Sequence, residues 1–119
     1  LPPVGARTQS AKGVRLDRTQ RIADLYCARA LELNRDDPER LRQRALRNLA
    51  RMRAQGSASS ALLDRWADVL EELEIFRWVL TAPDGKAAEL RRNHPLAGAL
   101  PETERQDIVR RTRDEPAST

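Results

Sequence analysis

The sequence predicts an all-α protein that folds as a single compact bundle of about five or six short helices. Ala, Leu, Arg and Glu dominate its composition, and these residue types lose little side-chain freedom in a helix. Aromatic residues, which favour strands, make up only 3% of the 119 residues. Apolar residues also recur at three- and four-residue steps over several segments. A chain of this length has room for one domain, so we expect one core.

Two helices are expected in the first half of the chain. Asp17 fits an N-cap for a helix that runs to Asn34. Asp37 and Pro38 suit the N-cap and first position of the next helix, and Gly56 suits the left-handed residue after its end. The apolar face of the first helix holds Ile22, Leu25, Tyr26, Ala30 and Leu33. That of the second holds Leu41, Ala45, Leu49 and Met52.

The second half predicts shorter elements. Ser59 or Ser60 caps a helix whose apolar face comprises Leu62, Leu63, Trp66, Val69, Leu70 and Leu73. The run 75–80 is either a central buried helix or a surface with an apolar side to spare, and the turn 83–85 ends it. A short helix over about 86–92, an irregular segment over 93–98 and a final helix started by Pro101, with Ile108 and Val109, follow.

The two ends of the chain differ from the middle. Residues 1–16 contain Pro, Gly and Ser with three cationic side chains, which predicts a flexible basic arm. Residues 17–113 form the helical domain, and 114–119, around Pro116, form a flexible tail. Positive charge is concentrated towards the N-terminus, because residues 1–56 are net +7 and residues 57–119 are net −3. This asymmetry favours an anionic partner for the front half, or mutual neutralisation when the halves pack or two copies form a homodimer.

Composition also bears on location and chemistry. Cys27 is the single cysteine, and no apolar run reaches the length of a membrane span, so we expect a cytoplasmic protein that does not bind membranes. Cys27 falls in the middle of a helix, and His94, the single histidine, precedes Pro95, where it suits a turn or a partner contact. We therefore expect no catalytic residues, no metal site and no cofactor. A catalytic protein would need a pocket around His94 or Cys27.

A stripe of arginines is the most distinctive feature of the second helix. Arg40, Arg44, Arg47 and Arg51 follow at steps of four, three and four residues, which aligns them along one side of a helix. Guanidinium groups bind carboxylates and phosphates, so this arginine stripe is a candidate partner-binding surface. The alternative is a solvated face paired with Glu39, Glu71, Glu72 or Glu74. An Arg-rich genome also accounts for 20 of the 22 basic residues being Arg.

The two tryptophans predict different surroundings. Trp66 lies centrally on an apolar helix face and is expected in the core. Trp78 falls outside the narrow arc that Ile75 and Val79 define, so it is either buried in the ordinary way or an anchor in a partner interface.

Four segments between about residues 18 and 110 have a distinctive pattern: 48–51, 63–66, 79–81 and 89–105. Together they resemble small bacterial all-helical modules of toxin–antitoxin and regulator operons. The most specific part of the resemblance is the pattern Leu-Arg-x-x-x-Pro-hydrophobic-Ala-Gly-x-Leu near the end. Such modules usually follow a DNA-binding helix-turn-helix, whereas only the arm 1–15 precedes this one, which puts direct operator binding in doubt.

Two functional hypotheses follow. The resemblance implies a non-enzymatic, antitoxin-like protein that neutralises or regulates a toxin-like partner protein by occlusion. Its candidate partner-binding residues are Arg40, Arg44, Arg47, Arg51, Trp78 and His94. The alternative is a small nucleic-acid-associated protein that binds the phosphate backbone through its basic N-terminal half.

Overall fold

The computed structural model describes residues 11–115, with side chains described from residue 17 onwards. Within this range the chain forms six α-helices and no strand, so the predicted all-α fold is confirmed. The helices are α2 (Ala11–Leu33), α3 (Pro38–Gln55), α4 (Ser60–Val69), α5 (Leu73–Val79), α6 (Gly85–Arg91) and α7 (Glu102–Asp114).

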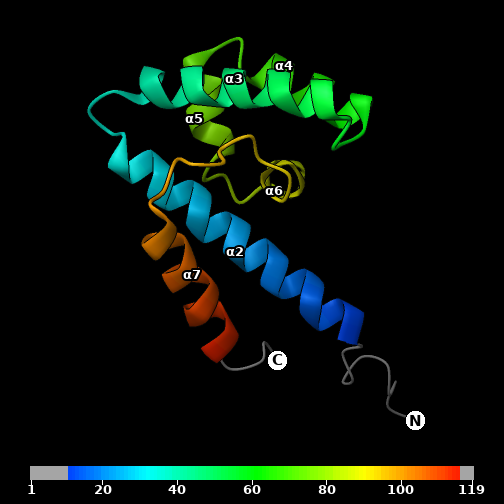
Figure 1. The fold of residues 1–119 in the computed structure, drawn as a ribbon, viewed down its shortest axis with the longest axis vertical. Coiled ribbons are helices and arrows are strands. Elements are labelled where there is room, and N and C mark those ends of the chain that lie inside the picture. The colour runs from blue at the N-terminus through cyan, green and yellow to red at the C-terminus, as the bar shows by residue number, and fades with distance from the viewer. Residues whose placement is uncertain (1–10, 116–119) are drawn as a thin grey trace.

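The helices form one elongated bundle around the long helix α2. In Figure 1, α7 lies along one side of α2, while α3 and α4 lie together at the opposite edge of the molecule. The short helices α5 and α6 fill the space between these two layers, since α5 packs on α3 and α6 packs on α2. The bundle measures 52 × 31 × 26 Å. No helix in the described range is both long enough and apolar enough to cross a membrane.

One continuous core joins all six helices. Trp66, Phe76, Leu70 and Leu80 are completely buried where α4 and α5 meet their neighbours. The indole N–H of Trp66 donates to the carbonyl of Leu90 at 3.2 Å, which satisfies the single polar atom of that side chain. The prediction that Trp66 belongs to the core is therefore confirmed.

The predicted signals at the ends of α3 and α4 act as expected. The Asp37 carboxylate accepts a hydrogen bond from the backbone N–H of Arg40 at 3.3 Å, and Pro38 opens the helix. Gly56 ends α3 with φ of 62°, in the left-handed region that glycine adopts without a steric penalty. The Ser59 hydroxyl accepts from the N–H of Leu62 at 3.2 Å and so caps α4.

The start of α2 differs from the prediction. The helix begins at Ala11 instead of after an N-cap at Asp17, so residues 11–16 of the predicted arm belong to it. Once a helix has formed, each further residue adds a hydrogen bond, and a single Gly13 costs only about 1 kcal/mol relative to Ala. Residues 1–10 of the predicted arm and 116–119 of the predicted tail lie outside the described residues.

The apolar run 75–80 was expected to form either a buried helix or a surface with an exposed apolar side. The structure shows features of both. The chain leaves the helix at Leu70 and passes through extended backbone at Glu72, so α5 starts afresh with a new orientation. A hydrogen bond from Arg42 Nη1 to the Leu70 carbonyl fixes this break. As a result, α5 buries Phe76 and Val79 but leaves its opposite side in solvent.

Candidate partner-binding surfaces

The arginine stripe lies along the solvent-facing edge of α3. Arg40, Arg47 and Arg51 are exposed and Arg44 is half-buried. At 1.5 Å per residue, the four positions span roughly 16 Å of the helix axis. The buried face of α3 lies beside the stripe, roughly 100° further around the helix, and holds Leu41, Ala45, Asn48 and Leu49.

The six arginines of α3 divide into paired and unpaired groups. Arg42, at the α4–α5 side, pairs with Glu39 at 2.7 Å, and Arg53 pairs with Asp64 at 2.8 Å. Hydrogen bonds from Arg42 and Gln43 lower the pKa of the Glu39 carboxyl to about 2. In contrast, no member of the arginine stripe forms an ion pair with any acidic side chain between residues 17 and 115.

The predicted pairing of the stripe with nearby glutamates is therefore wrong, whereas the exposure of the stripe agrees with a solvated face. Glu39 is occupied by Arg42, and Glu74 pairs with Arg77 on its own helix at 3.1 Å. The other two candidates, Glu71 and Glu72, lie in the connection between α4 and α5 and form no ion pair with the stripe. The side chains of the stripe thus have their charge available to a partner.

Arg44 is the stripe residue with the most restricted surroundings. Its Nη1 atom lies only 2.9 Å from the point where a Cβ would stand on Gly98, so the guanidinium lies directly over the glycine backbone. Gly98 itself has φ of 81°. One helical turn further along α3, Asn48 donates from Nδ2 to the carbonyls of Pro95 and Ala97, both at 3.0 Å. The irregular 93–98 segment is thereby fastened to α3.

Trp78 is the exposed aromatic residue of α5. Its exposed fraction is 56%, whereas Trp66, Phe76 and Tyr26 are at most 5% exposed. Ile75, one turn earlier, is 42% exposed, and residues three apart lie on the same side of a helix. Trp78 was expected to be either buried in the core or an anchor in a partner interface, and the prediction of burial is wrong. Ile75 and Trp78 form the exposed apolar pair of α5.

His94 lies in the turn that precedes α7. Its ring stacks on Tyr26 with 4.7 Å between ring centroids, and its Nδ1 accepts from the backbone N–H of Leu96 at 3.2 Å. Burial lowers the pKa of His94 to about 4. The Tyr26 hydroxyl donates to the carbonyl of Leu96 at 2.9 Å and accepts from the N–H of Leu100 at 3.3 Å. Through these contacts the half-buried His94 stabilises the turn, which is one of its two predicted roles; the other is a partner contact.

Cys27 lies inside the bundle on α2. It is completely buried, and burial raises the pKa of its thiol to about 12. A thiol in such surroundings stays protonated at neutral pH and behaves as a small apolar side chain. Within residues 11–115, no group of three or more His, Cys, Asp or Glu side chains is arranged to hold a metal ion.

An ion pair inside the bundle, between Arg91 and Asp24, was not predicted from the sequence. Arg91 on α6 is 5% exposed, and its Nε lies 2.9 Å from an Asp24 carboxylate oxygen on α2. Its Nη1 donates to the carbonyl of Val79 at 2.7 Å, so one guanidinium joins α2, α5 and α6. The available signal was the Leu-Arg pair that opens the family-like pattern. Most of that pattern is buried structure: Leu90, Arg91, Pro95, Leu96 and Leu100.

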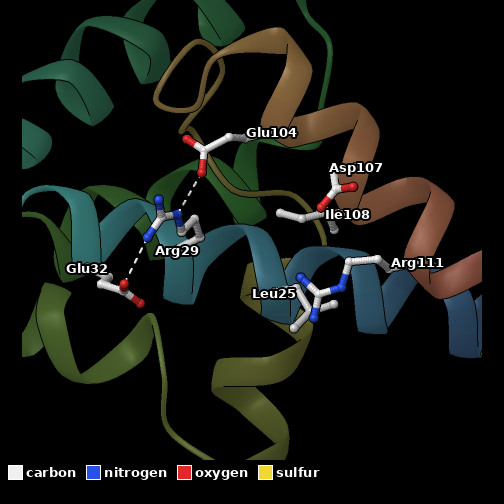
Figure 2. Close-up of a pocket in the computed structure, with 7 residues that line it drawn as sticks. All are labelled: Leu25, Arg29, Glu32, Glu104, Asp107, Ile108 and Arg111. Carbon is white, nitrogen blue, oxygen red and sulfur yellow. Dashed lines mark hydrogen bonds and ion pairs between the residues drawn. The ribbon is translucent and has the colours of Figure 1, made fainter.

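A groove of about 220 Å³ lies between α2 and α7 (Figure 2). Arg29 crosses it, with Nε at 2.8 Å from Glu104 of α7 and Nη1 at 2.8 Å from Glu32 of its own helix. Ile108 is buried beside these groups. Arg29 is thus engaged with both glutamates of the groove, and its bond to Glu104 fastens α7 to α2.

Comparison with known proteins leaves the family of the chain open. No family model, no curated protein and no solved structure matches this chain. The functional assignment consequently depends on the arginine stripe of α3 and the exposed apolar pair of α5.

Proposed function

We propose that this chain is a bacterial, cytoplasmic, protein-binding module that neutralises or regulates a partner protein by occlusion, in the manner of an antitoxin. The observation that carries the proposal is the exposure of Trp78, which is 56% exposed in a molecule whose other large aromatic side chains are buried. Exposed tryptophans are enriched among the residues that dominate binding energy in protein interfaces.

The surroundings of Trp78 suit an interface. Ile75 extends the apolar surface by one helical turn, and Glu74 and Arg77 form an ion pair beside it. An apolar centre with charged residues at its edge is the usual composition of a transient protein interface. The backbone below is rigid, because Phe76 and Val79 anchor α5 in the core. A partner can thus bury Trp78 without a rearrangement of this helix.

The two groups on which a catalytic alternative depends have structural roles. Cys27 is buried with a raised thiol pKa, and the His94 ring is stacked on Tyr26 with a lowered pKa. A nucleophile or a general base must reach a substrate. Cys27 is completely buried, and the half-buried His94 has its Nδ1 occupied by the backbone N–H of Leu96. These observations support a binding protein over an enzyme.

The proposal is tested by affinity purification from the source bacterium after nuclease treatment, with the variants Trp78→Ala and Leu33→Ala compared against the unmodified chain. Leu33 is the matched control, since it is 45% exposed but lies at the end of α2. We expect one stoichiometric protein partner, bound at least about 30-fold more weakly by Trp78→Ala, the effect of losing an interface hot spot. The Leu33→Ala variant should retain the partner and inhibit its activity.

Two results contradict the proposal. One is the absence of any stoichiometric, nuclease-resistant protein partner. The other is a partner that binds Trp78→Ala and Leu33→Ala equally well, which places the interface elsewhere. Circular dichroism of both variants checks that the helical content is unchanged, because both side chains are largely in solvent and neither belongs to the core.

A further inference from the structure

The charge on α3 is unusually one-sided. The helix contains six arginines and a single acidic residue, Glu39, and the next acid in the chain is Asp64 on α4. Arg42 and Arg53 neutralise these two carboxylates. The arginine stripe is left as four positive charges in a line of roughly 16 Å, with no acid of the described chain bound to them.

We infer that the arginine stripe binds the phosphodiester backbone of nucleic acid without reading its sequence. Guanidinium groups form bidentate hydrogen bonds to phosphate oxygens, and a linear row of cations is complementary to a regularly charged backbone. Helix α3, which carries the stripe, lies at an outer edge of the molecule (Figure 1). This site is distinct from the apolar pair of α5.

The neighbours of the stripe favour a phosphate polymer over an acidic protein surface. The exposed residues beside it on α3 are Gln43, Ala50 and Ala54, so the surface offers no large apolar side chain. Protein interfaces depend on buried aromatic or aliphatic anchors, whereas protein–nucleic acid interfaces are more polar and much more positively charged. The large exposed apolar residues of the described chain lie on α2 and α5 instead.

The two amide side chains that lie among the stripe residues in sequence, Gln43 and Asn48, are occupied by other contacts. Asn and Gln recognise adenine through their free amide groups. Asn48 is 7% exposed, and its amide N–H groups donate to the carbonyls of Pro95 and Ala97. Gln43 donates to Glu39 at 2.9 Å. These two amides are thus not free to read adenine. We assign the arginines to phosphate contacts, which position a protein on nucleic acid but carry no sequence information.

Arg44 is the half-buried member of this row. Its guanidinium lies over Gly98, where any side chain would displace it, and Asn48 holds the same loop against α3. The exposed Arg40, Arg47 and Arg51 can then adjust to the neighbouring phosphates.

The test is fluorescence anisotropy with a labelled 20-base-pair DNA duplex of mixed sequence, titrated with the full chain at several salt concentrations. Non-specific binding of this kind has a Kd of about 1–100 μM. Four neutralised phosphates predict a slope of about −3.6 in log K against log salt, which is a loss of about 150-fold between 50 and 200 mM salt. A scrambled duplex should bind equally, and a poly-glutamate peptide of equal charge should compete poorly.

A pair of charge-matched variants locates the site. Arg47→Gln/Arg51→Gln removes two exposed charges from the stripe, and Arg110→Gln/Arg113→Gln removes two exposed charges from α7. The stripe variant should reduce the steepness of the slope by about 1.8, whereas the α7 variant should leave it unchanged. Equal effects of the two variants, a slope near zero, or equal competition by poly-glutamate would overturn the inference. Trp78→Ala should bind the duplex normally, so a failure of this inference is separate from a failure of the protein-binding proposal.

Discussion

Replacing Asp24 and replacing Arg91, the two members of the buried ion pair, should lower the stability of the fold by different amounts. The side chain of Arg91 is 6% exposed, whereas that of Asp24 is 35% exposed. Asp24→Asn therefore leaves a guanidinium charge without a counter-charge in the interior, which costs about 3 kcal/mol. Arg91→Met keeps most of the apolar contacts and leaves a carboxylate that still reaches water and retains a 2.8 Å hydrogen bond from Gln20, so we expect a loss of about 1.5 kcal/mol.

The double variant distinguishes this argument from simple loss of contacts. Once Arg91 is Met, replacing Asp24 by Asn strands no charge, so the double variant should lose only about 2 kcal/mol. This is some 2.5 kcal/mol less than the sum of the two single losses, a coupling within the range found for directly contacting residues. Neighbouring contacts of the pair, such as the Arg91 hydrogen bond to the Val79 carbonyl, are removed equally in the single and double Met variants.

Urea unfolding followed by circular dichroism and by tryptophan fluorescence measures these differences. With an m-value of about 1.5 kcal/mol/M, Asp24→Asn should lower the unfolding midpoint by about 2 M and Arg91→Met by about 1 M. Trp66 reports on the core because it is fully buried next to Leu90. Additive losses, or a greater loss for Arg91→Met than for Asp24→Asn, would refute the reasoning that the unpaired buried guanidinium is the dominant cost.

Two further predictions concern the 94–98 turn. The pKa of His94 is lowered from 6.5 to about 4, so the unfolded chain takes up a proton before the folded one does, and stability falls as pH drops through this window. We expect a loss of about 2 kcal/mol between pH 7.5 and 5, which urea midpoints measure and which His94→Phe, able to stack on Tyr26, should abolish. Gly98→Ala and Gly56→Ala should each destabilise by about 1–2 kcal/mol in thermal unfolding, because both glycines have positive φ. Only Gly98→Ala should also weaken duplex binding, since its Cβ would displace Arg44 while nothing lies near a Cβ at Gly56; equal binding by both variants would contradict this.

The sequence predicted those parts of the fold that depend on local signals. Asp37, Pro38 and Gly56 define the ends of α3 through backbone geometry that a few neighbouring residues determine. The break between α4 and α5 was harder to locate, because it depends on Arg42 reaching the carbonyl of Leu70, 28 residues away. The start of α2 was misplaced for the opposite reason, since no strong stop signal lies between Ala11 and Asp17.

The candidate surfaces show the same limit. Spacing alone was sufficient to align the arginine stripe, but which arginines of α3 form ion pairs depends on tertiary structure. The other two arginines of α3, Arg42 and Arg53, pair with Glu39 and Asp64 in the folded chain. The buried Arg91–Asp24 pair joins residues 67 positions apart, which no periodicity could have revealed.

The two surfaces also have different physical requirements, and this bears on how they can act together. Binding through Trp78 gains most of its free energy from desolvated apolar area and should change little with salt, whereas binding through the arginine stripe depends on counterion release. Because α5 packs directly on α3, a bulky partner on one surface can affect access to the other. If the surfaces are sterically independent, Trp78→Ala and Arg47→Gln/Arg51→Gln should each abolish one activity only. If the partners exclude one another, saturating the chain with its protein partner should release the duplex at low salt, while the stripe variant keeps full affinity for the protein.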